Sequence, residues 1–243
     1  MFDHVTIRAT DRDASDRFYD TVLLPLGIER TYSTATFSEW RDLSLTAADA
    51  VTPVTQRLHV AFVAPSREQV DAFWRAGTEA GYRDDGPPGP RPQYSDDYYG
   101  AFLLDPDGNS AEAVNHGGMS RSGIVDHLWI RVADLDASRR FYRTIAEAAG
   151  LQPGHDGPDR VQFRSGRSSF SLIPGDEPTE HLHAAFPTDD DDVVRRFHAA
   201  ATAAGYASNG RPGERARYHP GYYAAYVLDP DGNNIEVVNH HRA

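Results

Sequence analysis

Two histidines and one glutamate occur in the same order in each half of this 243-residue chain. Two neutral imidazoles and a carboxylate can hold Fe(II), Mn(II), Zn(II) or Ni(II) and leave coordination positions open for another molecule. Each residue alone reads as an ordinary half-buried side chain, but both sets keep nearly equal spacing. The sequence therefore predicts divalent metal ions as cofactors, with the metal undetermined. The six candidate ligands are His4, His59 and Glu112, then His127, His183 and Glu236.

The segments around these residues are also repeated. The sequence 2–8 returns as 125–131, 58–62 returns as 182–186, and the segment Asp-Pro-Asp-Gly-Asn at 105–109 returns at 229–233. Each copy is long enough to be a domain. We therefore expect a first module over 1–116 and a second over 124–243, joined by a small, polar linker at 117–123.

Each module is expected to contain a strand-helix-strands unit twice. In the first module the pattern predicts strands at 5–9, 31–37, 40–46 and 58–63, and helices that end near Gly27 and Gly81. Residues 86–92 are rich in Gly and Pro and predict a loop. A hairpin follows, with strands 99–104 and 110–114, and the second copy repeats the order from a helix at 136–149 to a hairpin over 223–238. If the strands that bear His4, His59 and Glu112 adjoin, these side chains can converge on one face, since residues two apart in a strand point the same way.

Composition narrows the classes of function. The formal net charge is −12, which argues against nucleic acid as a partner. Cysteine is absent, which excludes disulfides and thiolate ligands and fits a cytoplasmic protein. No apolar run is long enough to span a membrane, and no secretory signal segment precedes the fold. We expect a small-molecule substrate or ligand as the partner, no nucleic acid or membrane partner, and either a monomer or a homodimer.

The two triads, the paired units and the segment Tyr-Tyr-x-Ala-(Phe/Tyr)-x-Leu-Asp-Pro-Asp-Gly-Asn-x-x-Glu resemble the vicinal oxygen chelate superfamily. This superfamily includes glyoxalase I, extradiol ring-cleaving dioxygenases, fosfomycin-resistance enzymes and bleomycin-resistance proteins. The resemblance covers nearly the whole chain. It implies an α+β fold in which four tandem βαβββ units form two half-barrel modules, each with a metal inside. It also implies that the metal is held by His4, His59 and Glu112 in one module and by His127, His183 and Glu236 in the other.

The resemblance leaves several functions open. The first is a metal-dependent enzyme, dioxygenase-like or glyoxalase- or fosfomycin-resistance-like, that binds a small molecule through two vicinal oxygens. The alternative is a non-catalytic, drug-sequestering protein of the bleomycin-resistance type, although such proteins generally lack the triad. Glyoxalase I has a fourth, acidic ligand; residues 161–173 contain no Asp, Glu or His, and only Glu39 and Asp42 are near the matching place in the first module. A chain with one catalytic and one structural module is also open.

Four further residues are candidates for catalytic roles. Tyr226 lies ten residues before Glu236, where extradiol enzymes, which this sequence resembles, place a tyrosine that acts on the substrate hydroxyl. Tyr99 and Tyr223 lie thirteen residues before their glutamates, and aromatic packing is the competing interpretation for all three. His219 has no histidine counterpart in the first module and could act as a general base.

Arg8 and Arg131 share the ligand face of their strands and could bind an anionic substrate or form an interior ion pair. His181 is the rival of His183 as a ligand, although the repeated segment favours His183. The remaining groups are interpreted as surface or near-site histidines and a solvated helix start; they are His116, His240, His241 and Asp189–Asp192.

Overall fold

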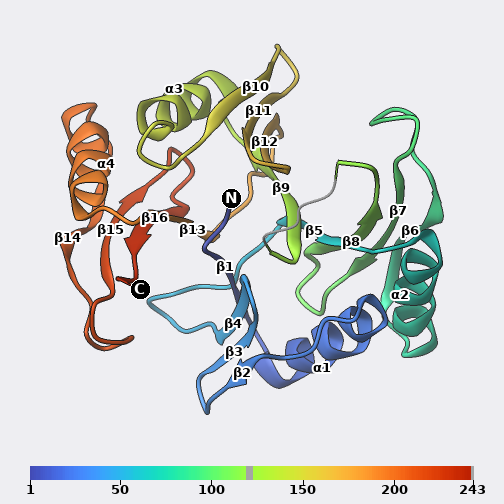
Figure 1. Ribbon diagram of the computed structural model, residues 1–243. Helices are drawn as coiled ribbons and strands as arrows, with labels where there is room; N and C mark the ends of the chain where they lie inside the picture. The colour runs from blue at the N-terminus through green and yellow to red at the C-terminus, as the bar shows by residue number, and fades with distance from the viewer. Residues whose placement is uncertain (119–122, 242–243) are drawn as a thin grey trace.

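Four βαβββ units build the protein, which confirms the expected α+β class (Figure 1). The computed structural model describes residues 1–118 and 123–241, so positions 119–122 of the predicted linker lie outside the described residues. The first unit contains β1 (His4–Ala9), α1 (Arg12–Leu23), the 3-10 helix η1 (Leu24–Leu26), β2 (Tyr32–Ser33), β3 (Phe37–Trp40) and β4 (Leu43–Ala47). The second contains β5 (His59–Val63), α2 (Arg67–Glu79), β6 (Arg83–Pro90), β7 (Tyr99–Leu104) and β8 (Ser110–Asn115).

The second half of the chain repeats both units. The third unit contains β9 (Val125–Val132), α3 (Leu135–Ile145), β10 (Gln152–Asp156), β11 (Val161–Ser165) and β12 (Ser168–Pro174). The fourth contains β13 (His183–Pro187), α4 (Asp191–Ala203), β14 (Ser208–Glu214), β15 (Tyr223–Leu228) and β16 (Asn234–Asn239).

The two eight-stranded sheets each combine units from both halves of the chain. One sheet has the order β14-β15-β16-β13-β1-β4-β3-β2, and the other has the order β10-β11-β12-β9-β5-β8-β7-β6. The halves meet where β1 pairs antiparallel with β13, and where β5 pairs antiparallel with β9. The first unit is therefore continuous with the fourth, and the second with the third.

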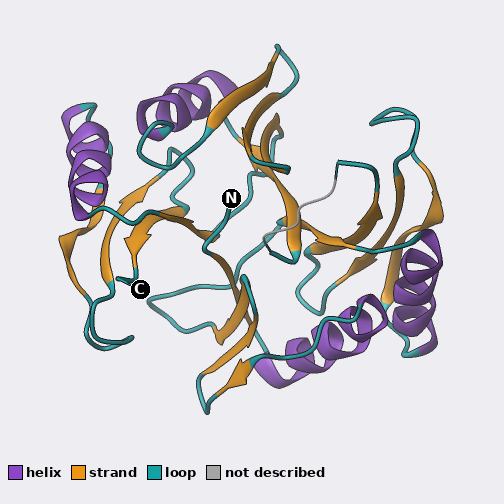
Figure 2. Cartoon of the chain, viewed as in Figure 1, coloured by secondary structure: helices purple, strands orange, loops and turns teal. Residues whose placement is uncertain are grey.

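Helix packing joins units of the same half, unlike the strand pairing that joins the two halves. Helix α1 packs on α2, and α3 packs on α4, so helix contacts join units of the same half. Figure 2 shows the helices at the outside of the molecule and the strands between them. Each half is thus held together by its helices, whereas the sheets run across the boundary between the halves.

Strand β1 shows how the two faces of a sheet are divided. Val5, Ile7 and Ala9 are fully buried in the hydrophobic core, whereas His4 and Thr6 alternate with them and are only partly buried. The polar face is therefore the one that points away from the core, as the period of two requires.

Strand β6 corrects one expectation. Residues 86–92 were predicted to form a loop, yet Arg83–Pro90 pairs with β7 as the edge strand of its sheet. The register shifts twice along this pairing, and an edge strand tolerates Pro because one of its sides needs no hydrogen-bond donor. Among the described helices, none combines the length and apolar character needed to cross a membrane.

Candidate metal centres

The six predicted ligands gather into two clusters, each drawn from both halves of the chain. Site 1 consists of His4, His183 and Glu236, and site 2 consists of His59, Glu112 and His127. The expected grouping of one triad per module is wrong, because β1 lies beside β13 and β5 lies beside β9. The histidine that opens each module has exchanged places with its counterpart, while each second histidine stays with its own glutamate.

The donor atoms have the spacing that one ion requires. In site 1 the His4 and His183 Nε2 atoms are 3.0 Å apart, and Glu236 Oε2 lies 2.9 Å from His183 Nε2 and 3.6 Å from His4 Nε2. In site 2 Glu112 Oε2 lies 3.0 Å from His59 Nε2 and 3.4 Å from His127 Nε2. Ligands about 2.1 Å from a metal in tetrahedral or octahedral geometry are separated by about 3.0 to 3.4 Å. Both clusters fit a single divalent ion.

The repeated Asp-Pro-Asp-Gly-Asn turn places the second histidine beside the glutamate. Asn109 Oδ1 accepts a hydrogen bond from the Leu58 backbone N–H (3.0 Å), and Asn109 Nδ2 donates to the Thr55 carbonyl (3.0 Å). The turn between β7 and β8 is thereby tied to the start of β5, which pairs in parallel with β8. Asn233 makes the same two bonds in the other half, to Leu182 and Thr179.

A buried tyrosine holds the free oxygen of each glutamate. The Tyr222 hydroxyl donates to Glu236 Oε1 (2.6 Å), and the Tyr98 hydroxyl donates to Glu112 Oε1 (2.7 Å). Burial beside these carboxylates raises the pKa of both tyrosines, so the hydroxyls remain protonated donors. The other carboxylate oxygen, Oε2, is the one that faces the histidines.

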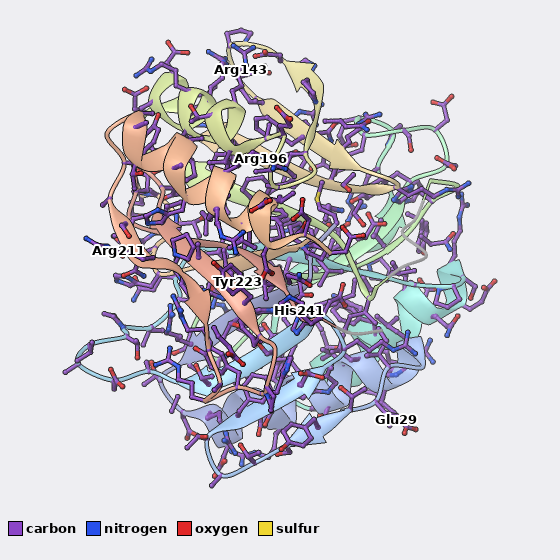
Figure 3. The ribbon with its side chains drawn as sticks, turned by 60° about the vertical axis from the view of Figure 1, so that its left-hand side comes forward. Glu29, Arg143, Arg196, Arg211, Tyr223 and His241 are labelled. Carbon is purple, nitrogen blue, oxygen red and sulfur yellow. The ribbon has the colours of Figure 1, made fainter. Side chains whose placement is uncertain are left out.

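The sequence prediction chose the neighbouring tyrosines instead. Tyr99 donates to Asp71 on α2 (2.8 Å), and the Arg195 guanidinium of α4 lies over the Tyr223 ring. Figure 3 labels Tyr223 on the strand that runs beside α4. Both residues therefore lie on the helix-covered face, because they are an odd number of positions from their glutamates along a hairpin whose side chains alternate.

Each opening histidine is fixed by the aspartate before it. Asp3 Oδ1 accepts from His4 Nδ1 (2.8 Å), and Asp126 Oδ2 accepts from His127 Nδ1 (3.0 Å). With its proton on Nδ1, a neutral imidazole directs the Nε2 lone pair into the cluster. The sequence prediction did not include these aspartates. An aspartate precedes both opening histidines, and this repetition could have indicated that it supports the histidine.

The histidines that follow β8 and β16 complete this support, in agreement with their interpretation as near-site residues. His116 Nε2 lies 3.1 Å from Asp126 Oδ2, and His240 Nε2 lies 2.9 Å from Asp3 Oδ2. In site 1 the chain is longer, because His240 Nδ1 contacts His219 Nε2 at 2.8 Å. His219 is therefore separated from the ligands by His240 and Asp3, and its role as a general base stays a prediction.

Electrostatics couple the ligands tightly. Burial alone would raise the pKa of Glu112, but hydrogen bonds from His127 and His59 lower it to about 2. Burial alone would lower the pKa of His127, but Asp126 and Glu112 outweigh this and raise it to about 9. In site 1 burial lowers the pKa of His183. The metal-free clusters therefore hold the glutamate as an anion ready to bind a cation.

Tyr226 lies beside Glu236, as its position ten residues before that glutamate predicted. It pairs with Glu236 across β15 and β16, and its ring centroid is 6.2 Å from that of His183. Its hydroxyl is buried near the Glu236 carboxylate, and burial together with that negative charge raises its pKa. Phe102 occupies the matching place in site 2, with its ring 5.9 Å from His59.

The two strand arginines bond to backbone. Arg8 Nη1 donates to the His181 carbonyl (2.9 Å), and Arg131 Nη1 donates to the Arg57 carbonyl (3.3 Å). Arg57 and His181 each lie two residues before the second histidine of a triad, so these bonds help to anchor β5 and β13. Substrate binding by Arg8 and Arg131 stays a prediction.

The other candidates lie outside the two clusters. His181 is not among the grouped ligands, which favours His183 as the sequence did. His241 Nε2 contacts Asp191 at 3.1 Å near the start of α4, and Asp190 caps that helix, as expected for the acidic run Asp189–Asp192. Figure 3 labels His241 after the last strand.

Of the acids considered for a fourth ligand, Asp42 is engaged elsewhere, whereas Glu39 lies near site 1. Burial alone would lower the pKa of His4, but Asp3, Glu236 and the added charge of Glu39 raise it. The Asp42 carboxylate accepts from the Ile124 backbone N–H (2.8 Å), and Glu39 is within 3.3 Å of the Thr31 hydroxyl. Neither belongs to the grouped ligands, so each cluster consists of three residues among those described.

The family model named Glyoxalase/Bleomycin resistance protein/Dioxygenase superfamily matches residues 1–113 and 124–237. The chain belongs to this superfamily. The uncharacterized Bacillus subtilis protein YqjT is 26% identical over 124 residues, which are 47% of this chain and 97% of that protein. A crystal structure of glyoxalase I from Zea mays superposes with a TM-score of 0.68 at 19% identity, covering 98% of this chain and 92% of that one. This superfamily likeness confirms the fold across both halves.

Proposed function

We propose that the protein is a metal-dependent enzyme of the vicinal oxygen chelate type, acting on a small oxygenated molecule. The observation that supports it is the presence of two triads whose donor atoms all lie within 4.8 Å of one another. Three ligands leave at least one coordination position open, and usually two or three, for a substrate. A bound divalent ion would act there as a Lewis acid toward two adjacent oxygens.

The protein's own residues prepare these positions. Asp3 and Asp126 orient the opening histidines, and Tyr98 and Tyr222 hold one oxygen of each glutamate away from the ligand cluster. His4 and His59 keep 21% and 19% of their side chains exposed, so both clusters can be reached from solvent. In site 1 the Tyr226 hydroxyl, buried near Glu236 with its ring beside His183, is the group best placed to contact a bound oxygen.

The proposal covers a dioxygenase-like and a glyoxalase- or fosfomycin-resistance-like reaction. The three-residue grouping favours the dioxygenase-like reaction, whereas the nearness of Glu39 to His4 keeps the glyoxalase-like reaction open at site 1. The second candidate is a non-catalytic protein that sequesters a drug, and the net charge of −12 favours it for cationic compounds. We also propose a cytoplasmic location, which the absence of cysteine fits. The assembly is proposed to be a monomer or a homodimer; a monomer would suffice, because both triads are complete within one chain.

Metal content and chelation separate these two candidates. Protein purified without chelators or an affinity-tag metal should bind about two divalent ions per chain after reconstitution with Fe(II), Mn(II), Zn(II) or Ni(II). The metal-loaded protein should then bind acetohydroxamate, a small molecule with two vicinal oxygens, and the metal-free protein should not. Failure to bind any of the four metals would refute the enzyme proposal; drug binding by the metal-free protein would then support sequestration.

A further inference from the structure

The two sites have different walls at the position opposite the second histidine. Thr6 pairs with His183 across β1 and β13, whereas Trp129 pairs with His59 across β9 and β5. The backbone registers are equivalent, so the sites differ here by a threonine and an indole. Because residues two apart share a face, Thr6 and Trp129 each lie on the same side as the opening histidine of their strand.

Trp129 belongs to an aromatic surface beside site 2. Its ring centroid is 6.3 Å from those of both His59 and His127, and 5.7 Å from that of Tyr94. Phe102 adds a second ring on the other side of His59. Tyr94 is 45% exposed, and Trp129 and Phe102 are half-buried. The guanidinium groups of Arg160 and Arg91 lie over the Trp129 and Phe102 rings, so a ligand would contact the remaining exposed ring surface. We call Tyr94, Phe102 and Trp129 the aromatic wall.

The Trp129 side chain does not replace the hydrogen bond that its counterpart Thr6 makes to the neighbouring strand; its contacts are with rings and with the Arg160 guanidinium. In site 1 the Thr6 hydroxyl lies 2.8 Å from the Ser44 hydroxyl on the neighbouring strand. The matching neighbour of Trp129 is Ser171, whose buried hydroxyl has no hydrogen-bond partner among the described residues. A buried hydroxyl without a partner is destabilising. Trp129 thus differs from Thr6 in placing an indole beside the two histidines of site 2 in place of a hydroxyl that bonds to the neighbouring strand.

The indole borders the site without closing it. The side chain of His127 is 8% exposed, against 21% for His4 in the corresponding place, so Trp129 covers that histidine. His59 nevertheless remains 19% exposed, against 10% for His183. Site 2 is therefore approached over His59, between Trp129 and Phe102.

We propose that site 2 selects metal-chelating ligands that carry an aromatic ring next to their two oxygens, and that site 1 does not. The inference rests on the proposed metal function, because the chelating oxygens must bind the ion that His59, Glu112 and His127 would hold. A ring attached to those oxygens would lie against the aromatic wall. In site 1 Tyr226 and Tyr218 stand in the places of Phe102 and Tyr94, so the two sites differ in this surface at Trp129, where Thr6 supplies no ring.

The test uses two probes that differ by a ring. Acetohydroxamate and benzohydroxamate present the same two oxygens, with a methyl or a phenyl group. His183→Ala should leave only site 2 able to bind metal, and His59→Ala only site 1. Titration calorimetry of each metal-loaded variant, with the metal-free protein as background, gives the affinity ratio of the two probes.

We expect His183→Ala to favour benzohydroxamate more than His59→Ala does, by roughly three- to tenfold. Adding Trp129→Thr to His183→Ala should abolish that difference without changing acetohydroxamate affinity or metal content, and Trp129→Phe should retain most of it. Equal ratios in the two single variants, or no effect of Trp129→Thr, would overturn the inference while leaving the metal proposal intact. Absence of hydroxamate binding in every metal-loaded variant would refute the proposed function itself.

Discussion

The regrouping of the ligands predicts which pairs of substitutions act on the same metal. His4 and His183 belong to site 1, although 179 residues separate them, whereas His59 belongs to site 2. The double variant His4→Ala/His183→Ala should therefore lose one metal per chain, no more than either single variant loses from that site. His4→Ala/His59→Ala should lose both metals.

The grouping of the ligands also predicts how much bound metal adds to the free energy of unfolding of each variant. A ligand present at 100 times its dissociation constant stabilises the folded protein by about 2.7 kcal/mol per site. Two independent sites would contribute about 5.4 kcal/mol, and a single variant would retain about 2.7 kcal/mol. The same-site double variant should also retain about 2.7 kcal/mol, and the cross-site double variant should show no metal-dependent gain.

Elemental analysis after gel filtration measures the stoichiometry, and urea unfolding with and without metal measures the free energy of unfolding. His181→Ala is the matched control, because His181 lies two residues before His183 and outside both clusters. If His4→Ala/His59→Ala retained one metal and His4→Ala/His183→Ala retained none, the ligands would be grouped by module and the cross-half pairing would be refuted.

Three further predictions follow from the contacts of site 2 and the linker. Tyr98→Phe should weaken metal binding about 10- to 100-fold in competition with a chelator, because it leaves Glu112 Oε1 unpaired, whereas Tyr99→Phe should leave affinity unchanged. In His183→Ala, the metal affinity of site 2 should fall about tenfold for each pH unit below 9, because the metal must displace a proton from His127, whose pKa is raised to about 9. The same raised pKa stabilises the metal-free folded protein. This contribution is complete below about pH 6.5 and is lost as pH rises through 9. A pH-independent affinity would contradict this. Cleavage at a protease site inserted in 119–122 should leave both halves in one complex with both metals, because β1–β13 and β5–β9 pair across the halves; separation on gel filtration in native buffer would count against it.

The sequence predicted the ligands because they carry a local signal. His4 and His127 recur in matching strands, and Glu112 and Glu236 follow the same turn at the same distance. The turn chemistry also predicted the hairpins, since Gly108 adopts a φ of +88° that favours glycine. Each of these inferences depends on residues close together in the chain.

The partner of β1 could not be predicted in that way. Strand β1 pairs in parallel with β4 inside its own unit, and its other edge can accept the opening strand of any other unit. The equivalent strands β1, β5, β9 and β13 differ little in pattern, so sequence periodicity does not distinguish within-half from cross-half pairing. The choice depends on how the units pack, and it decides the composition of both metal sites.

The strand alternation would have corrected the tyrosine assignment. Phe102 and Tyr226 pair directly with the glutamates, so residues four positions earlier, Tyr98 and Tyr222, share their face. Tyr99 and Tyr223 lie an odd number of positions away and must point toward the helices. The rule was available in the sequence, but counting distance from the glutamate alone selected the wrong member of each Tyr-Tyr pair.

The proposed selectivity depends on a position, Thr6 in site 1 and Trp129 in site 2, that is constrained differently from the candidate ligands. The ligand positions are constrained on several sides, because each histidine or glutamate is held by an aspartate, a tyrosine or a turn-anchored strand. The position opposite the second histidine is not itself a candidate ligand, and its contacts differ between the sites: Thr6 bonds to Ser44, whereas Trp129 contacts Tyr94, the two histidines of site 2 and Arg160. There the fold accepts either a threonine that pairs with Ser44 or an indole that leaves Ser171 unpaired. Under our proposal, metal binding depends on His4 and His127, and ligand choice depends on Thr6 and Trp129, two residues further along the same strands.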